Sequence, residues 1–145
     1  MIIYESSVTY RKVGEVPMAK TIDGPGSIMD YMRGAFKAFP LQEQVWVLPM
    51  SRKNHIMSRE MVGLGTATAC LVSPSVVFRP VIMQGAPAMA VVHNHPSGDP
   101  QPSGADMKMA KKLEKCGKVL DIQVLDFVVI GHNTYWSAND AGLVG

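Results

Sequence analysis

Cysteine is scarce in this sequence, and long apolar runs are missing from it. The chain of 145 residues contains two cysteines, Cys70 and Cys116, and two cysteines do not make a disulfide framework. The segment MIIYESSVTYRK has no basic region followed by an apolar one, so it lacks the pattern of a signal peptide. No stretch approaches the roughly 20 apolar residues that cross a bilayer. These absences predict a cytoplasmic protein with reduced thiols and no membrane segment.

The chain also lacks an excess of either charge. It has 14 Lys and Arg against 12 Asp and Glu, and the net charge of +2 is too small to indicate nucleic-acid binding by itself. Hydrophobic residues make up 47% of the chain, which is enough for a sizeable core in one domain of ordinary size. The composition therefore predicts one globular domain and leaves a nucleic-acid partner open.

Apolar periodicity and turn residues predict an alternation of strands and helices. The expected strands are residues 2–13, at a sheet edge, 45–50, 55–62, 88–92, 123–130 and 134–137. The expected helices are residues 28–39 after an N-cap at Ser27, a short helix from Pro74 to near Gly85, and residues 103–119. Because hairpins interrupt the alternation, the order favours an α/β domain with a mixed β-sheet flanked by helices. Residues 1–40 are expected to form a strand, loop and helix extension packed on the core, and residues 41–145 the main domain.

Two histidines and one aspartate stand at spacings that suit a metal site. His93 and His95 follow a predicted buried strand, and residues i and i+2 of a strand point to the same side. Asp106 lies in the first turn of the helix predicted to begin at Ser103, so its carboxylate can face the strand end. Two neutral imidazoles and a carboxylate make a suitable zinc ligand set, with the fourth position left for water. Zinc there would lower the pKa of that water and polarise a substrate carbonyl.

Each of these residues also has an ordinary structural interpretation. Ser103 and Asp106 fit a helix-capping box, and a lone histidine near an apolar strand is usually structural. The conjunction of two histidines at strand spacing, a proline-rich loop, and a serine and an aspartate at a helix start favours metal binding over coincidence.

The run HNHPSGDPQPSGAD, from His93 to Asp106, resembles the JAMM motif of the MPN metalloprotease superfamily, written His-x-His-x7-Ser-x2-Asp. It is similar in particular to the RadC branch, in which His-Asn-His-Pro-Ser-Gly-Asp-Pro and a second Pro-Ser recur. The resemblance extends over residues 41–143. It implies an MPN and cytidine-deaminase-like architecture, a bound Zn²⁺ ion, and cleavage of a peptide or isopeptide bond by zinc-activated water. The implied partner is a peptide or protein substrate, including one with a ubiquitin-like tail.

The resemblance also implies roles for the residues of the motif. His93, His95 and Asp106 correspond to the metal ligands. Ser103 corresponds to the residue that helps to stabilise the tetrahedral oxyanion, and helix capping does not exclude this role. Three further residues of the motif are expected to shape the loop: Asn94, Ser97 and Asp99.

The superfamily needs a glutamate at the start of a core strand as general base. Glu43 comes directly before the apolar run at residues 45–48 and is the natural match. A carboxylate there can take a proton from water and later deliver it to a leaving amine. Glu60, which lies beside another predicted strand, is the rival candidate, and a solvated acid at a strand end is the ordinary interpretation of either residue.

Three functions stay open at this point. The first is a zinc metallohydrolase acting on a peptide or isopeptide bond, the second a RadC-like protein acting on or near DNA, and the third a non-catalytic MPN scaffold. Members of the RadC branch carry a helix-hairpin-helix region ahead of the metal domain, and the residues before Glu43 show no such pair of helices. We therefore expect that DNA-binding module to be absent. The complete ligand set favours an enzyme, since a scaffold has no need of an open metal site.

Five lysines fall on one side of the last predicted helix, at steps of three and four: Lys108, Lys111, Lys112, Lys115 and Lys118. A solvated face is the ordinary interpretation, and a docking surface for an acidic partner is the alternative. The two remaining histidines, His55 and His132, are expected not to bind metal.

Overall fold

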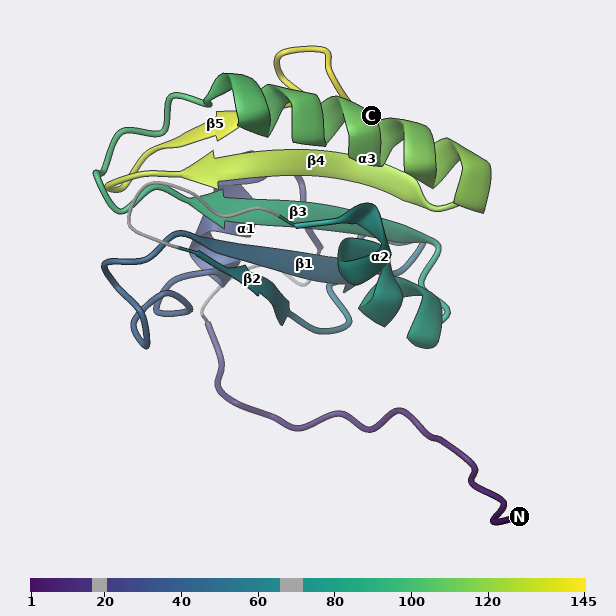
Figure 1. Ribbon diagram of the computed structural model, residues 1–145. Helices are drawn as coiled ribbons and strands as arrows, with labels where there is room; N and C mark the ends of the chain where they lie inside the picture. Colours follow the sequence, from purple (N-terminus) through teal and green to yellow (C-terminus); the bar gives the residue numbers. More distant parts are fainter. Residues whose placement is uncertain (17–20, 66–71) are drawn as a thin grey trace.

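A five-stranded mixed β-sheet forms the centre of the chain, with helices on both of its faces (Figure 1). The computed structural model describes residues 1–16, 21–65 and 72–145. In chain order the elements are α1 (Pro25–Tyr31), β1 (Gln44–Met50), β2 (Glu60–Leu64), α2 (Pro74–Met83), β3 (Ala88–Asn94), α3 (Gly104–Leu120), β4 (Gln123–Ile130) and β5 (Tyr135–Ser137). Their order across the sheet is β2-β1-β3-β4-β5.

The strands β3 and β4 pair in parallel, while the other three neighbouring pairs are antiparallel. A parallel pair needs a crossover connection, and α3 supplies it. Every residue of β3 is buried, as expected of a central strand that is covered on both faces. The predicted α/β domain with a mixed sheet is confirmed.

Apolar side chains on the two faces of the sheet form two separate cores. The helices α2 and α3 pack on one face, over residues such as Val47, Val91 and Val129. The helix α1 and the turns after it pack on the other face, over residues such as Leu48 and Val92. Because side chains of a strand alternate between faces, each central strand contributes to both cores. Both faces of the central sheet are therefore buried by apolar side chains, and polar residues can gather at the ends of the strands.

Most elements lie where the sequence predicts them. The strands expected at residues 45–50, 88–92, 123–130 and 134–137 are confirmed as β1, β3, β4 and β5. The helices expected after Ser73 and from residue 103 are confirmed as α2 and α3, with Ser73 and Ser103 as their N-caps.

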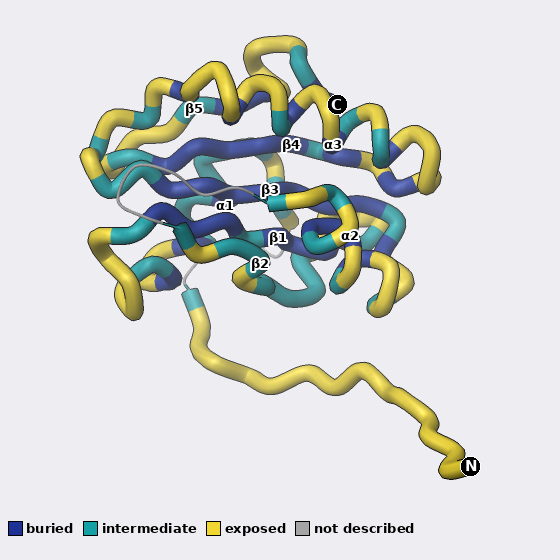
Figure 2. The backbone as a smooth tube through the Cα atoms, in the orientation of Figure 1, coloured by how far each residue is buried: buried dark blue, intermediate teal, exposed yellow. Residues whose placement is uncertain are grey.

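The strand predicted over residues 2–13 is wrong. Residues 1–15 are exposed and form no helix or strand, and Figure 2 shows them as an exposed tail leading away from the sheet. A strand needs a neighbour for its backbone N–H and C=O groups, and β-forming residues alone do not supply one. Within the described parts of the chain, no helix is long and apolar enough to cross a membrane.

The first helix differs from the prediction at both ends. It begins at Pro25 after an N-cap at Gly24, where Ser27 was expected to cap it, and it ends at Tyr31, well before residue 39. Proline suits the first helical position, and Gly34, with a φ of 80°, takes a left-handed conformation that no helix accommodates. The turns that follow α1 still bury Met32 against the sheet.

The strand predicted over residues 55–62 begins later than expected. Before β2 starts at Glu60, a single bridge joins Met50 to Ile56. The strand then runs through Gly63 to Leu64, beyond the predicted end at residue 62. A bulge between Val45 and Trp46 in the β1–β2 pairing accommodates this irregular return.

Candidate metal centre

The two histidines of the motif lie where β3 leaves the sheet. His93 is still part of β3 and is 2% exposed, and His95 is the first residue after the strand. The backbone N–H of His95 donates to the carbonyl of Ile130 at 2.9 Å, which prolongs the parallel pairing with β4 beyond the last residue of β3. The two imidazole rings lie edge to face, with centroids 5.0 Å apart. Both rings therefore face one point, as the strand spacing predicts.

Two glycines hold the loop after His95 against the turn that follows β4. The N–H of His132 donates to the carbonyl of Gly98 at 2.8 Å. Gly98 has a φ of 90°, and a Cβ on Gly131 would overlap the backbone of Gly98. Glycine at these two positions allows the backbones to approach closely. This contact fixes the loop that carries the second histidine.

Backbone carbonyl groups orient both imidazoles. Nδ1 of His93 lies 2.9 Å from the carbonyl oxygen of Gln44, and Nδ1 of His95 lies 2.9 Å from that of Asp99. A carbonyl oxygen only accepts hydrogen bonds, so Nδ1 carries the proton in both rings. Each neutral ring then presents an unprotonated Nε2 atom to the site. This is the arrangement that orients histidine ligands in metal sites.

The carboxylate of Asp106 faces both Nε2 atoms. Its Oδ1 lies 3.4 Å from Nε2 of His93, and its Oδ2 lies 3.1 Å from Nε2 of His95. Asp106 and Ser103 also form the capping box at the start of α3, with hydrogen bonds of 2.8 and 3.0 Å. The capping interpretation and the metal-site interpretation of Asp106 are thus compatible, because the box positions the carboxylate that faces the histidines.

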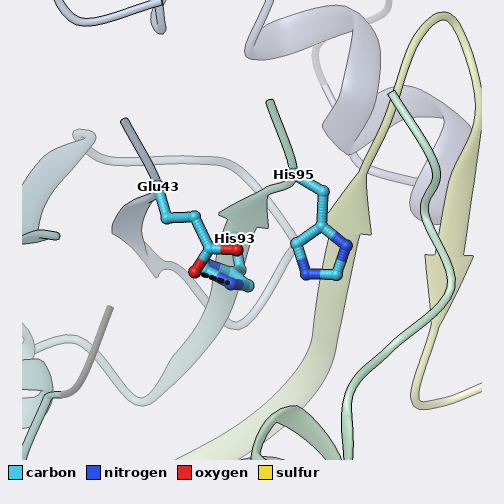
Figure 3. A group of neighbouring side chains, drawn as sticks. All are labelled: Glu43, His93 and His95. Carbon is cyan, nitrogen blue, oxygen red and sulfur yellow. Dashed lines mark ion pairs between the residues drawn. The ribbon is translucent and has the colours of Figure 1, made fainter. Parts of the chain in front are cut away.

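Glu43 approaches the histidines from the first residue before β1 (Figure 3). It is 8% exposed, and its Oε2 lies 3.5 Å from Nε2 of His93. Within residues 1–16, 21–65 and 72–145, Glu43, His93 and His95 form a group with ligand atoms within 4.8 Å of one another. The chain therefore has a triad that can hold a metal ion, with Asp106 beside it.

Two polar residues hold Glu43 in position: Asn94, which was expected to shape the loop, and Gln44, which the sequence did not single out. Asn94 accepts the N–H of Gln44 at 2.5 Å and donates to the carbonyl of Gln42 at 3.2 Å. The side chain of Gln44 donates to the carbonyls of Phe36 and Phe39, which anchors β1 to the turns after α1. Since Gln44 also orients His93, both residues couple the position of Glu43 to that of the histidines. A buried amide directly after a candidate base is the signal that could have revealed Gln44.

The facing atoms of this site fit a divalent cation. Two imidazole Nε2 atoms and two carboxylates meet at 3.1 to 3.5 Å, and with both rings neutral all of these atoms accept hydrogen bonds. Acceptors held this close in a buried site repel one another unless a proton or a cation lies between them. Imidazole and carboxylate together are a typical zinc ligand set. A cavity of about 30 Å³ lies beside His93 and Asp106, which is space for a water molecule.

The other residues singled out in the sequence lie outside this group. Glu60 accepts a hydrogen bond from Ser58 at 3.3 Å and is not part of the triad. His55 and His132 are exposed. Cys70 falls outside the described residues.

The model of the RadC-like JAB domain matches residues 22–143. The chain belongs to the RadC-like JAB domain family. This RadC-like chain is 38% identical over 123 residues to a UPF0758 protein of Chlorobaculum tepidum, covering 85% of the chain and 55% of that protein. It is 40% identical over 103 residues to a UPF0758 protein of Methanosarcina mazei, covering 71% of the chain and 45% of that protein. The RadC-like chain thus spans about half the length of the curated relatives it matches.

Proposed function

We propose that this RadC-like domain is a zinc-dependent hydrolase that cleaves a peptide or isopeptide bond. The observation that supports it most is the convergence of acceptor atoms in a buried site. Backbone carbonyls hold the protons of His93 and His95 on Nδ1, so both Nε2 lone pairs face the carboxylates. A purely structural cluster would place hydrogen-bond donors there. The bond class rests on the resemblance of the motif to the JAMM metalloproteases.

His93, His95 and Asp106 are the residues that would hold the ion. Asp106 is the better third ligand, because its carboxylate faces both imidazoles while the ion-pair contact of Glu43 reaches His93 alone. Asp106 is also held in place by the capping box, as a ligand should be. Zinc, when bound, would lower the pKa of a water molecule and polarise the carbonyl of a substrate.

Glu43 acts in this proposal as general base and then as general acid. Its carboxylate accepts a proton from the attacking water and donates it to the leaving amine. The burial of Glu43 and the bonds of Asn94 to the residues on either side of it keep this carboxylate beside the site. A base at hydrogen-bond distance from the reacting water contributes most when its position is fixed in this way.

Ser103 serves as a donor to the substrate oxygen. Its hydroxyl oxygen accepts the N–H of Asp106 at 3.0 Å, and the hydroxyl proton has no acceptor among the described residues. Ser103 is exposed, so that proton is available to an oxyanion that forms next to Asp106.

Metal content is the first test of this function. The full chain and His93→Ala, both purified without chelator and without a nickel affinity step, are analysed by elemental mass spectrometry. We expect about one zinc per chain in the wild type and none in the variant. Fluorogenic peptide and ubiquitin-like isopeptide substrates are then assayed on the zinc-loaded chain. His55→Ala, which removes an exposed histidine, serves as the matched control and should keep its zinc. A wild-type chain that takes up no zinc after incubation and dialysis contradicts the proposal.

A second candidate is action on nucleic acid, and the outer face of α3 favours it. Its five lysines are all exposed: Lys108, Lys111, Lys112, Lys115 and Lys118. Affinity for single-stranded and duplex DNA that falls steeply with salt would support this candidate. Replacing three of these lysines by glutamine should then weaken binding, and the absence of binding at low salt would exclude it.

A further inference from the structure

We propose that the groove between α2 and α3 binds an amphipathic helix of a partner protein, one with acidic side chains beside its apolar face. The groove has a volume of about 690 Å³, and the two helices that form it pack on the same face of the sheet (Figure 1). Its residues on α3 begin at Lys115, more than two turns away from Asp106. The proposal therefore does not depend on the function of the metal centre.

The rims of the groove carry exposed apolar side chains. Ile82 and Met83, the last two residues of α2, are 55% and 57% exposed. Val119 and Leu120, the last two residues of α3, are 84% and 44% exposed. Apolar side chains that gather around one groove in this way mark a binding surface. A small-molecule site buries most of its ligand, whereas these rims stand in solvent, so a partner that covers both rims fits better.

The charge of the groove is of one sign. Arg79 and Lys115 are the charged side chains among the described residues that line it. Both are exposed, and neither forms an ion pair within residues 1–16, 21–65 and 72–145. Lys112 lies three residues before Lys115 and seven before Val119, so it extends the positive charge along the same side of α3. Acidic side chains on the partner complement this surface.

The walls of the groove suit a helix as the bound segment. All of its described lining residues lie within α2 or α3, so most of their backbone groups are already bonded inside a helix. An extended peptide would find no strand edge there to pair with. A helix instead packs its side chains between the ridges of two others. Since α2 has 10 residues and is about 15 Å long, a partner helix of about three turns covers both rims.

A second copy of this chain and a nucleic acid both fit this groove less well. A two-fold dimer uses the same patch twice, so it would bring the cations of the two grooves together, and like charges repel. The phosphates of a nucleic acid suit Arg79 and Lys115 but leave the apolar rims in water. An acidic amphipathic helix satisfies the cations and the apolar side chains together.

Peptide selection on the full chain tests the chemistry of the partner. A phage-displayed library of random peptides of about 16 residues, or roughly four helical turns, is selected on the immobilised wild-type chain. We expect the enriched peptides to carry apolar residues at steps of three and four, with Asp or Glu beside them. Enrichment of Lys or Arg in their place, or no enrichment at all, overturns the proposal.

Fluorescence anisotropy of one enriched, labelled peptide tests whether it binds to the apolar rims. In Ile82→Ser combined with Val119→Ser we expect its dissociation constant to rise roughly tenfold or more, because two apolar contacts are lost. Val13→Ser combined with Leu41→Ser removes two apolar side chains that are 66% and 75% exposed outside the groove, and should leave the constant unchanged. The substituted residues of both variants are exposed, and circular dichroism checks that the chains stay folded. Equal constants in wild type and the groove variant overturn the proposal.

The same peptide tests the two cations. In Arg79→Gln combined with Lys115→Gln we expect the dissociation constant to rise about two- to tenfold and to depend less on salt concentration. Arg52→Gln combined with Lys53→Gln makes the same change of charge at exposed positions outside the groove and is the control. An unchanged constant in the groove variant, or an equal rise in the control, contradicts charge complementarity.

Three further outcomes would each assign the groove to another occupant and overturn the proposal. Sedimentation could reveal a wild-type dimer that dissociates in Ile82→Ser combined with Val119→Ser, which assigns the groove to a second copy. Peptide binding that appears only after residues 1–15 are deleted assigns it to the tail of the chain. Single-stranded DNA that loses affinity in the same apolar variant assigns it to nucleic acid.

Discussion

Two groups of buried polar side chains lie in the same sheet and differ in what faces them. Asp126, in the middle of β4, is 4% exposed. Its Oδ1 accepts the backbone N–H groups of Phe127 and Asn139 at 2.7 and 3.0 Å, and its Oδ2 accepts the hydroxyl of Ser137 at 2.7 Å. In the candidate metal centre, by contrast, Glu43 and Asp106 face the Nε2 atoms of two histidines, whose Nδ1 protons are already bound by backbone carbonyls.

This difference separates a carboxylate that donors satisfy from carboxylates that could hold a cation. Burial of a carboxylate is costly in either place, and hydrogen-bond donors compensate for that cost around Asp126. Around Asp106, part of the compensation is left for a cation to provide. Burial alone would therefore mark both Asp126 and Asp106 as candidate site residues. The atoms that face each carboxylate, donors at Asp126 and histidine nitrogens at Asp106, distinguish the two. The following predictions test this distinction.

Replacing Glu43 by Gln should have the largest effect on activity. The isosteric amide cannot accept the proton of the attacking water, so we expect kcat/KM to fall by roughly 10²- to 10⁴-fold. Zinc content should stay at the wild-type level, because Glu43 is assigned as base and not as ligand. Glu60→Gln makes the same change of charge away from the site and should keep its activity. Loss of zinc in Glu43→Gln would instead make Glu43 a ligand.

Replacing Asp106 by Asn should act on the metal. A neutral amide is a poor zinc ligand, and we expect the dissociation constant for zinc, measured by competition with a chelating dye, to rise by more than about 100-fold. The side-chain oxygen of asparagine can still accept the N–H of Ser103, so α3 should remain capped. Asp99→Asn, in the loop that leads to α3, is the control. Equal zinc affinity in wild type and Asp106→Asn would contradict the ligand assignment.

Replacing Asp126 by Asn should act on stability and leave zinc bound. The amide has one acceptor oxygen, so it cannot accept both the Ser137 hydroxyl and the backbone N–H groups of Phe127 and Asn139, and the bonds that remain lose the charge. We expect the free energy of unfolding, measured in urea, to fall by about 1–3 kcal/mol. Asp140→Asn, an exposed residue nearby, should change it little. Loss of zinc in a folded Asp126→Asn chain would remove the distinction between the two groups.

The pH dependence of Asp126 should be the smallest of these effects. Burial raises the pKa of Asp126 above its ordinary value of 3.8, and the hydrogen bonds from Ser137, Asn139 and Phe127 oppose this shift. In the window above 3.8 the folded state keeps a proton that the unfolded state has lost, so the free energy of unfolding decreases as pH rises through the raised pKa. The stability difference between wild type and Asp126→Asn should therefore be larger in acid than at neutral pH. Urea unfolding of both chains after chelator treatment measures it, and a difference that grows with pH would contradict the assignment.

The core strands and the motif were predictable because their signals are local. Residues 45–50 and 123–130 are apolar runs of strand length, and Ser73 and Ser103 are caps that precede helices. The spacing of His93 and His95 predicts two imidazoles on one side, and both rings do face the same point. Such patterns depend only on the period of the element.

The tail at residues 2–13 and the role of Asp126 were not predictable in this way. The tail has the pattern of a strand, yet no edge of its own chain pairs with it among the described residues. Asp126 falls inside an apolar run, and apart from the N–H of Phe127 its donors come from residues 11 and 13 positions further along the chain. Neither property can be predicted from a short window of neighbouring residues.

The sequence by itself determined the order of helices and strands from α1 onward, the mixed sheet flanked by helices and the set of residue types that can hold a metal. The tertiary structure alone decided which carboxylates face the histidines, which nitrogen of each ring carries the proton, and which buried acid is satisfied by donors. The reason is that apolar periodicity acts over one or two turns of chain, whereas hydrogen-bond partners such as Gln44 and His93 come from strands that meet only when the sheet forms.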